Sequence, residues 1–504
     1  QPDHHDIHSH CGRMEGRKAR PWTRTTRLYN SHDTTQINPK NNANRAANTM
    51  QNLRFLQIHN LYPVYYTYLY AKIPHLADAP YEVQNTVLID DGFAGIHMFA
   101  PYLGEHGYET QLVFANCSQA QQRWGAENGL RISGRDWEQD ILRHQIERFQ
   151  PDILYLSDPI SFDSRFIRSL PRRPRLILGW RAANIPAHTD WSEFDVILSA
   201  LPNLLRMAKS LGARSTELFS PGVPARFPQR FAGQERTTDV SFAGQMNATQ
   251  YKRRNALLEA LASSAAKSRF TLDLHLILPN GFQTIQAIEA YRRPPAFGTD
   301  LYKALSRTKI AFDARGSIEL QNHPSNRSRT SLDLAETTTA NMRIFEATAC
   351  GALLLTEEQS NLHQYFEPGT EIVTYRDESD LIKSIEYFLS NDDERQAIAE
   401  RGRQRCLRDH SMAAKAKRLD TIIRNYLETV ATKREGSSRQ PAIPNGNHIE
   451  QPVFSGTLSE ALVHLEHLAK TYPRRKPGRL VIENQILDFA DLHSVYHELK
   501  QIFA

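Results

Sequence analysis

The sequence predicts an α/β protein built from two doubly wound parallel sheets. Short apolar segments with the composition of buried strands alternate with helical segments along most of the chain. This alternation is typical of parallel sheets that carry helices on both faces. With 504 residues, 40% of them hydrophobic, the chain is too long for one ordinary core. We therefore expect two folded domains and less regular segments at both ends.

The first domain is expected over residues 52–230 and begins with the buried strand Leu53–His59. Asn60 and Pro63 favour a turn directly after this strand. Further strands are predicted at 109–115, 152–156, 175–179, 195–199 and 214–219. Helices are predicted at 81–90, 95–106, 135–149 and 202–211. Because strands and helices alternate at short spacing, we expect these strands to lie parallel in one sheet.

Polar or aromatic side chains stand at several strand ends of this first domain. They are His59, Asn116, Asp158 and Trp180. Parallel sheets bind ligands in the crevice at the carboxyl ends of their strands. We therefore expect these four side chains to line one crevice, although each of them, taken singly, also fits a purely structural role.

The second domain is expected over residues 231–410, followed by a crossover helix at 411–435. A strand at 239–243 leads through Gly244, which permits close backbone approach, to a helix at 251–262. Further strands are predicted at 271–278, 309–313 and 371–375, and further helices at 378–389, 392–408 and 411–431. The polar segment 314–338 is long for a loop in a compact domain, which indicates a functional or mobile segment.

Arg253 and Arg254 stand in the first turn of the predicted helix 251–262. A cation there is unfavourable for the helix dipole, which indicates an anionic ligand nearby. An ordinary surface charge is the alternative.

The most informative stretch is residues 340–357. It predicts a short helix at 340–349 capped by Thr339, a stop at Gly351 and a buried strand at 352–355. A helix start of this kind suits an anion such as a diphosphate. Arg343 and Glu346 share one face, and a carboxylate one turn inside the helix can accept hydrogen bonds from two sugar hydroxyls. An ordinary helix with a solvated Glu–Arg pair fits the same pattern.

Composition excludes several classes of protein. A net charge of +5 is mild and fits anionic substrates or contact with an anionic membrane surface without requiring either. There is no basic stripe with stacking aromatic residues, so no nucleic-acid partner is expected. No apolar run reaches 18 residues, so no membrane span is expected. The four cysteines are scattered, which predicts a reducing cytoplasm without disulfides or a zinc site.

The two ends of the chain differ from the domains in composition. Residues 1–51 are polar and predicted to be disordered, and their histidines are interpreted as adventitious metal ligands at most. Residues 436–456 are rich in Gly, Ser, Pro and Asn and predict a linker. Residues 457–504 predict a small extension with helices at 457–470 and 491–503 and a strand at 479–487.

The segment 341–356 carries a family resemblance. Its pattern Asn-x-Arg-x-Phe-Glu-Ala-x-x-Cys-Gly-x-Leu-Leu-Leu-Thr resembles the C-terminal signature of CgeB-like glycosyltransferases. The continuation Phe-Glu-Pro-Gly-Thr-Glu-Ile-Val at 366–373 agrees, as do 240–244 and Arg254-x-x-Leu-Leu upstream. In the first domain, Asn116 and the segment Trp-Gly-Ala-Glu-x-Gly at 124–129 are similar to the family. The resemblance covers residues 53–432.

The resemblance implies a GT-B fold, in which two Rossmann-like domains face a cleft, and transfer of a sugar from a nucleotide-sugar donor. It implies that Glu346 holds the ribose hydroxyls. It also implies that Arg254, Arg343 and the helix start at Asn341 hold the diphosphate, with Gly244 at the same site. Such enzymes normally need no metal or cofactor, because protein cations and a helix dipole neutralise the leaving group.

One departure leaves the stereochemistry open. Retaining GT-B enzymes often carry a second glutamate eight residues before the ribose-binding one, and here that position is Thr338. An inverting reaction requires a general base from the first domain, for which His59 and Asp158 are the candidates.

The predicted function is therefore a cytoplasmic glycosyltransferase, located in the cytosol or at the inner membrane face, acting on a glycan, lipid-linked or protein acceptor. Two alternatives stay open, a non-catalytic nucleotide-sugar or glycan-binding protein and a sugar-nucleotide epimerase. Residues 481–503 faintly resemble the start of FkbM-type methyltransferases, with a docked strand and helix as the alternative. The donor base, the sugar, the acceptor and the oligomeric state are not determined by the sequence.

Overall fold

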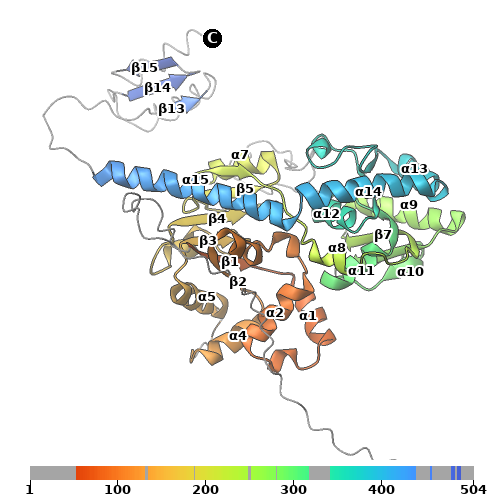
Figure 1. The fold of residues 1–504 in the computed structure, drawn as a ribbon, viewed down its shortest axis with the longest axis horizontal. Coiled ribbons are helices and arrows are strands. Elements are labelled where there is room, and N and C mark those ends of the chain that lie inside the picture. The colour runs from red at the N-terminus through yellow and green to blue at the C-terminus, as the bar shows by residue number, and fades with distance from the viewer. Residues whose placement is uncertain are drawn as a thin grey trace, which may run out of the picture. The chain divides into compact units, whose positions relative to one another are not determined.

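The computed structural model describes residues 53–438 and three short strands beyond them, except for 131–133, 135, 187, 248–250, 280 and 317–340. Within that part, the chain forms two six-stranded parallel sheets (Figure 1). The predicted α/β class with two doubly wound sheets is confirmed. The expected tail 1–51, the helices 457–470 and 491–503, and Thr338 lie outside the described residues.

The first sheet has the strand order β2-β1-β3-β4-β5-β6, and all neighbours are parallel. Its strands are β1 (Leu53–His59), β2 (Tyr108–Phe114), β3 (Ile153–Leu156), β4 (Leu176–Trp180), β5 (Val196–Ser199) and β6 (Thr216–Leu218). The chain moves outward in one direction from β1 to β2 and in the other from β3 onward. The switch point, where such sheets bind ligands, therefore lies between the carboxyl ends of β1 and β3.

Helices cover both faces of this sheet. They are α1 (Pro63–Lys72), α2 (Tyr81–Asp91), α3 (Ala100–Leu103), α4 (Ser118–Glu127), α5 (Trp137–Phe149), α6 (Ser164–Arg168) and α7 (Pro202–Ser210), whereas the next helix, α8 (Arg226–Arg230), packs against the second lobe. Alternate strand residues enter different cores: Phe55 and Tyr155 join one cluster, whereas Leu56 and Leu154 join the other. This burial on both faces explains why the strands are almost continuously apolar.

The second sheet has the order β12-β11-β10-β7-β8-β9, again parallel throughout. Its strands are β7 (Thr238–Gln245), β8 (Leu272–Ile277), β9 (Arg292–Arg293), β10 (Thr308–Phe312), β11 (Leu353–Glu357) and β12 (Val373–Tyr375). Its helices are α9 (Lys252–Ser268), α10 (Gln286–Tyr291), α11 (Gly298–Ser306), α12 (Met342–Ala349), α13 (Glu378–Ser390) and α14 (Asp392–Asp409). Here the switch point lies between β7 and β10.

The last long helix, α15 (Met412–Ser438), packs on the first lobe rather than on the second (Figure 1). Met412, Leu419 and Ile423 are fully buried in the same cluster as Phe55. The hydroxyl of Tyr108 donates to Asp420 at 2.7 Å, which fixes the helix across the edge of the sheet. The core of the first lobe is thus built from two distant parts of the chain.

Several predicted elements need correction. The segment 95–106 is not one helix but two 3₁₀ turns, Gly95–His97 and Gly104–His106, on either side of α3. The chain enters it through Ala94 at a positive φ of 55°, which interrupts helical geometry. Helix α4 was not predicted, because its sequence is mostly polar. Helices α10 and α11 and the strand β9 were also not predicted.

The short helix of the second lobe begins later than expected. Its N-cap is Asn341 rather than Thr339, and helical residues start at Met342. The stop at Gly351 is confirmed, since this residue adopts φ +72° and its N–H bonds to the Thr348 carbonyl at 2.9 Å.

The C-terminal end differs from the expectation in two places. The predicted linker 436–456 contains the end of α15 and the strand β13 (Phe454–Gly456). The single strand predicted at 479–487 is a pair of antiparallel strands, β14 (Gly478–Ile482) and β15 (Gln485–Phe489). Among the described helices, none combines the length and apolar composition needed to cross a bilayer.

Candidate active site

A buried aspartate, Asp313, holds the start of α12 at the carboxyl edge of the second sheet. Asn341 Nδ2 donates to both its carboxylate oxygens, at 3.1 and 2.9 Å, and Thr356 Oγ1 donates at 2.9 Å. Asn341 Oδ1 in turn accepts the N–H of Ile344 at 3.2 Å and so caps the helix. Burial raises the pKa of Asp313, and these hydrogen bonds oppose that rise. The N-terminus of α12 is thereby fixed beside the switch point.

Arg343 and Glu346 form a buried ion pair on one face of α12. Arg343 Nη1 donates to Glu346 Oε2 at 2.8 Å, and the two side chains are 17% and 4% exposed. Burial raises the pKa of Glu346, while the charge of Arg343 opposes this. The alternative of a solvated surface pair is therefore wrong. Arg343, one turn earlier on the same face, contacts only Oε2 of this carboxylate among the described interactions.

Arg254 bridges the carboxyl ends of two strands. Its Nε donates to the carbonyl of Ala314 at 2.9 Å and its Nη1 to the carbonyl of Gln245 at 3.1 Å. Its guanidinium stacks on the Tyr251 ring, 4.2 Å from the centroid. Burial lowers the pKa of Arg254, and the charge of Asp313 opposes this. A partly buried cation thus stands at the switch point of the second sheet.

The neighbouring Arg253 has partners within the protein. It forms an ion pair with Glu357, and its Nη2 donates to the carbonyl of Arg376 at 2.8 Å. The cation in the first turn of α9 is therefore compensated without a ligand at this position.

The close approach predicted at Gly244 is made by the protein itself. A Cβ at this position would lie 2.7 Å from the Phe242 ring, which packs in the core. The described contact therefore explains the glycine by packing, and its role beside a ligand stays a prediction.

In the first lobe, Asp158 is held by a network directly after β3. Asn60 Nδ2 donates to it at 3.2 Å, Ser161 Oγ at 2.7 Å and the N–H of Ile160 at 3.3 Å. Arg181, at the end of β4, completes an ion pair with Asp158 at 3.6 Å. The carboxylate is therefore oriented by its neighbours at the first switch point.

Two buried histidines lie beside this network. His59 and His97 are 5% and 8% exposed, with their ring centroids 6.5 Å apart. Burial lowers the pKa of His59 to about 4, against the charge of Asp158, and the pKa of His97 to about 3. No described residue bonds to either ring nitrogen of His59 or to Nδ1 of His97. Both imidazoles are neutral at pH 7, the state that a general base requires.

Three of the four strand-end residues come together in this region. Trp180 packs against His97 with the ring centroids 4.2 Å apart, and His97 is positioned by Gln57, whose Nε2 donates to its carbonyl at 2.6 Å. Asn116 does not join them. It accepts the N–H of Leu61 at 3.1 Å and so fixes the loop that follows β1.

Sequence reasoning missed Asp313, Thr356, His97 and Arg181. Asp313 and Thr356 could have been found, because both stand at the ends of correctly predicted strands, the same signal that selected His59 and Asp158. His97 and Arg181 carried no such signal, since His97 lay inside a helix that does not form and Arg181 follows a strand end already assigned to Trp180.

Comparison with known proteins bears on the second lobe. Residues 252–421 match the family described as glycosyl transferase-like. The matched stretch runs from α9 into α15 and contains Arg254, Asp313, Asn341, Arg343 and Glu346. This match confirms the predicted class of protein, a glycosyltransferase.

Solved structures are similar to the chain at low sequence identity. A glycosyltransferase from Rickettsia africae covers 75% of this chain and 99% of its own length, with 10% identity and a TM-score of 0.46. The structure of Anabaena Alr3699/HepE in complex with UDP and glucose covers 74% of this chain and 100% of its own length, with 11% identity and a TM-score of 0.44. The structure of sucrose-phosphate synthase from Thermosynechococcus elongatus covers 75% of this chain and 100% of its own length, with 10% identity and a TM-score of 0.44. No curated protein matches the chain.

Proposed function

We propose that the protein transfers a sugar from a nucleotide-sugar donor bound at the second switch point to a hydroxyl-bearing acceptor bound by the first lobe. The observation that carries the proposal is the cluster around the start of α12, where a capped helix, a partly buried cation and a carboxylate meet. This is the combination of groups that a nucleoside diphosphate requires.

In this proposal the diphosphate lies at the free N–H groups of α12 beside Asn341, with Arg254 and Arg343 supplying positive charge. Gly244 lies along the same edge. Glu346 holds the ribose: its Oε2 remains with Arg343, and Oε1 accepts from the ribose hydroxyls. These groups stabilise the charge that develops on the departing diphosphate.

For an inverting transfer, we propose His59 as the general base. The acceptor oxygen forms a bond to the anomeric carbon while its proton moves to a ring nitrogen of His59. The bond from the anomeric carbon to the diphosphate breaks, and its electron pair leaves with the nucleotide. Asp158 acts on His59 rather than on the substrate, because its charge stabilises the imidazolium that forms.

The proposal is tested by product analysis with a panel of nucleotide sugars and acceptors. Release of nucleoside diphosphate together with a glycosylated acceptor is expected. Binding of a nucleotide sugar without turnover would instead indicate a binding protein, and an isomerised nucleotide sugar would indicate an epimerase. The CgeB-like subfamily, the glycan, lipid-linked or protein acceptor, a cytoplasmic location and peripheral membrane contact belong to the same proposal.

Replacing Glu346 with glutamine is expected to weaken donor binding by about 1–3 kcal/mol, because charged hydrogen bonds to the ribose become neutral ones. The amide oxygen can still accept from Arg343, so the fold should be retained. Titration calorimetry with the turnover-competent nucleotide measures the change. Glu289→Gln is the matched control, since Glu289 pairs with Arg292 at the same spacing on the surface. Equal affinities for both variants would remove Glu346 from the ribose site.

Metal removal is expected to leave activity unchanged. In this proposal Arg254, Arg343 and the start of α12 neutralise the diphosphate, so the site requires no divalent cation. Initial rates should agree before and after dialysis against EDTA. A loss of activity that added Mn²⁺ restores would contradict this arrangement.

A further inference from the structure

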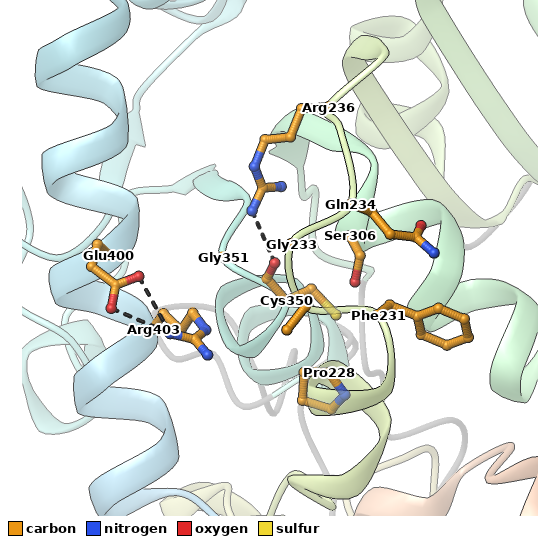
Figure 2. A pocket seen from close by; sticks show the side chains of 11 residues that line it. Pro228, Phe231, Gly233, Gln234, Arg236, Ser306, Cys350, Gly351, Glu400 and Arg403 are labelled. Atoms are coloured by element: carbon orange, nitrogen blue, oxygen red, sulfur yellow. Dashed lines mark hydrogen bonds and ion pairs between the residues drawn. The ribbon is translucent and has the colours of Figure 1, made fainter.

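A hollow lies at the opposite end of α12 from the proposed donor site. It has a volume of about 240 Å³ and is lined by residues of α8, α11 and α14, by the segment that follows α8 and by the two residues directly after α12 (Figure 2). Arg236 and Arg403 reach it from two sides, and Gly351 lies between them. A Cβ at Gly351 would be 2.8 Å from Arg236 Nη2 and 3.2 Å from Arg403 Cδ. The glycine therefore allows both arginines to lie close to the helix end.

The lining carries an excess of positive charge. Glu400 is its one carboxylate, and it accepts from Arg403 at 3.2 Å. Arg236 has only backbone acceptors among the described residues, the carbonyls of Thr308 and Cys350. Burial lowers the pKa of Arg236, and the nearby charges of Arg395 and Arg403 lower it further, whereas Cys350 and Glu400 oppose this. A bound anion would relieve this repulsion between like charges.

A buried hydroxyl and an apolar wall complete the hollow. Ser306 is 5% exposed, and no hydrogen bond of standard geometry joins its Oγ to a described residue, although the hydroxyl lies within reach of the Cys350 thiol and lowers its pKa against the effect of burial. Figure 2 shows this hydroxyl directed toward the space between Cys350 and Phe231. Phe231 and Pro228 form the apolar side. A buried hydroxyl with no stronger described partner than a thiol, facing a cationic hollow, is suited to donate to a ligand with oxygen acceptors.

We propose that this hollow is a binding site for a small phosphate-bearing ligand, separate from the donor site. Arg403 and Ser306 would donate to the phosphate oxygens, and Phe231 would contact a short carbon chain. The volume suits inorganic phosphate or a small phosphomonoester and is below the range typical of drug-sized ligands, which excludes a complete nucleotide sugar.

The site is connected to α12 through Arg236. Its Nη2 donates to the Cys350 carbonyl at 3.0 Å, at the end of the helix whose other end carries Asn341. A ligand at Arg236 therefore acts on the same short helix that the donor site uses.

Titration of the full chain with inorganic phosphate and with glycerol 3-phosphate, at constant ionic strength, tests the proposal. We expect saturable binding by calorimetry and a matching rise in melting temperature. Arg403→Met should weaken the affinity at least about tenfold, and Ser306→Ala about three- to tenfold. Tighter binding of glycerol 3-phosphate would identify an organic phosphate as the occupant, and equal binding would identify inorganic phosphate.

Arg401→Met is the matched control. Arg401 lies on the same helix, donates to the Thr370 carbonyl and does not line the hollow. Its affinity for phosphate should stay within about twofold of the unchanged protein. Absence of saturable binding, or equal affinity in the Arg403→Met, Ser306→Ala and Arg401→Met variants, would overturn the proposal, the latter because the phosphate would then bind elsewhere.

Discussion

Replacing Arg343 with methionine is expected to destabilise the protein by about 3–5 kcal/mol. The substitution removes the cation that pairs with Glu346 and leaves a carboxylate 4% exposed without compensation. Methionine keeps much of the side-chain volume, so the loss reports the charge rather than a cavity. The free energy of unfolding from denaturant titration at pH 7 measures the effect.

A double substitution provides the internal control. In Arg343→Met/Glu346→Gln no charge remains buried, so most of the lost stability should return. Arg403→Met, which breaks the equally spaced pair with Glu400 at the surface, should cost less than about 1 kcal/mol. If Arg343→Met and Arg403→Met cost the same, the pair on α12 is not the desolvated interaction that the structure describes.

Acidification from pH 7 to pH 5 is expected to remove about 6 kcal/mol of stability through three buried histidines. Burial lowers the pKa of His59 to about 4, of His97 to about 3 and of His410 to about 4, from an ordinary value of 6.5. At a pH between the ordinary and the lowered pKa, the histidines bind protons in the unfolded chain but not in the folded one. The stabilising contribution of the neutral histidines is therefore complete above pH 6.5 and is lost as the pH decreases toward 3. At pH 5 the free energy of unfolding is therefore lower than at pH 7 by about 2 kcal/mol for each histidine.

Glutamine variants distinguish the effect of these histidines on stability from that of the carboxylates, which take up protons at lower pH. His97→Gln and His410→Gln should each reduce the slope of unfolding free energy against pH by about 1.2 kcal/mol per unit between pH 6 and 4.5. His75→Gln serves as control, because the His75 side chain is 89% exposed. An unchanged slope in the His97→Gln/His410→Gln double variant would show that burial of neutral imidazoles is not the cause.

Most strands of the two large sheets and the short helix α12 were predictable because their signals are local. β1 matches its predicted bounds, and the stop at Gly351 follows from the one residue type that readily adopts its conformation. The segment around His97 was not predictable, since it is held by Gln57, whose Oε1 accepts the N–H groups of Phe99 and Ala100 from over forty residues away. No periodicity in the sequence encodes such a contact.

The same distinction applies to the site. The spacing of Arg343 and Glu346 predicts that both lie on one face of the helix. Whether they form a buried ion pair depends on side-chain conformation and burial, which the spacing does not determine. Asp313 was within a predicted strand and was overlooked, although its role depends on Asn341 and Thr356, which reach it from different elements.

The packing of α15 affects how the polypeptide can fold during synthesis. Met412, Leu419 and Ile423 fill the core of the first lobe, yet they leave the ribosome only after the whole second lobe has been made. The core of the first lobe therefore stays incomplete, with apolar surface exposed, until α15 has been synthesised. A fragment that ends at residue 230 would expose that apolar surface permanently. Separate expression of the two lobes would require α15 to be attached to the first one.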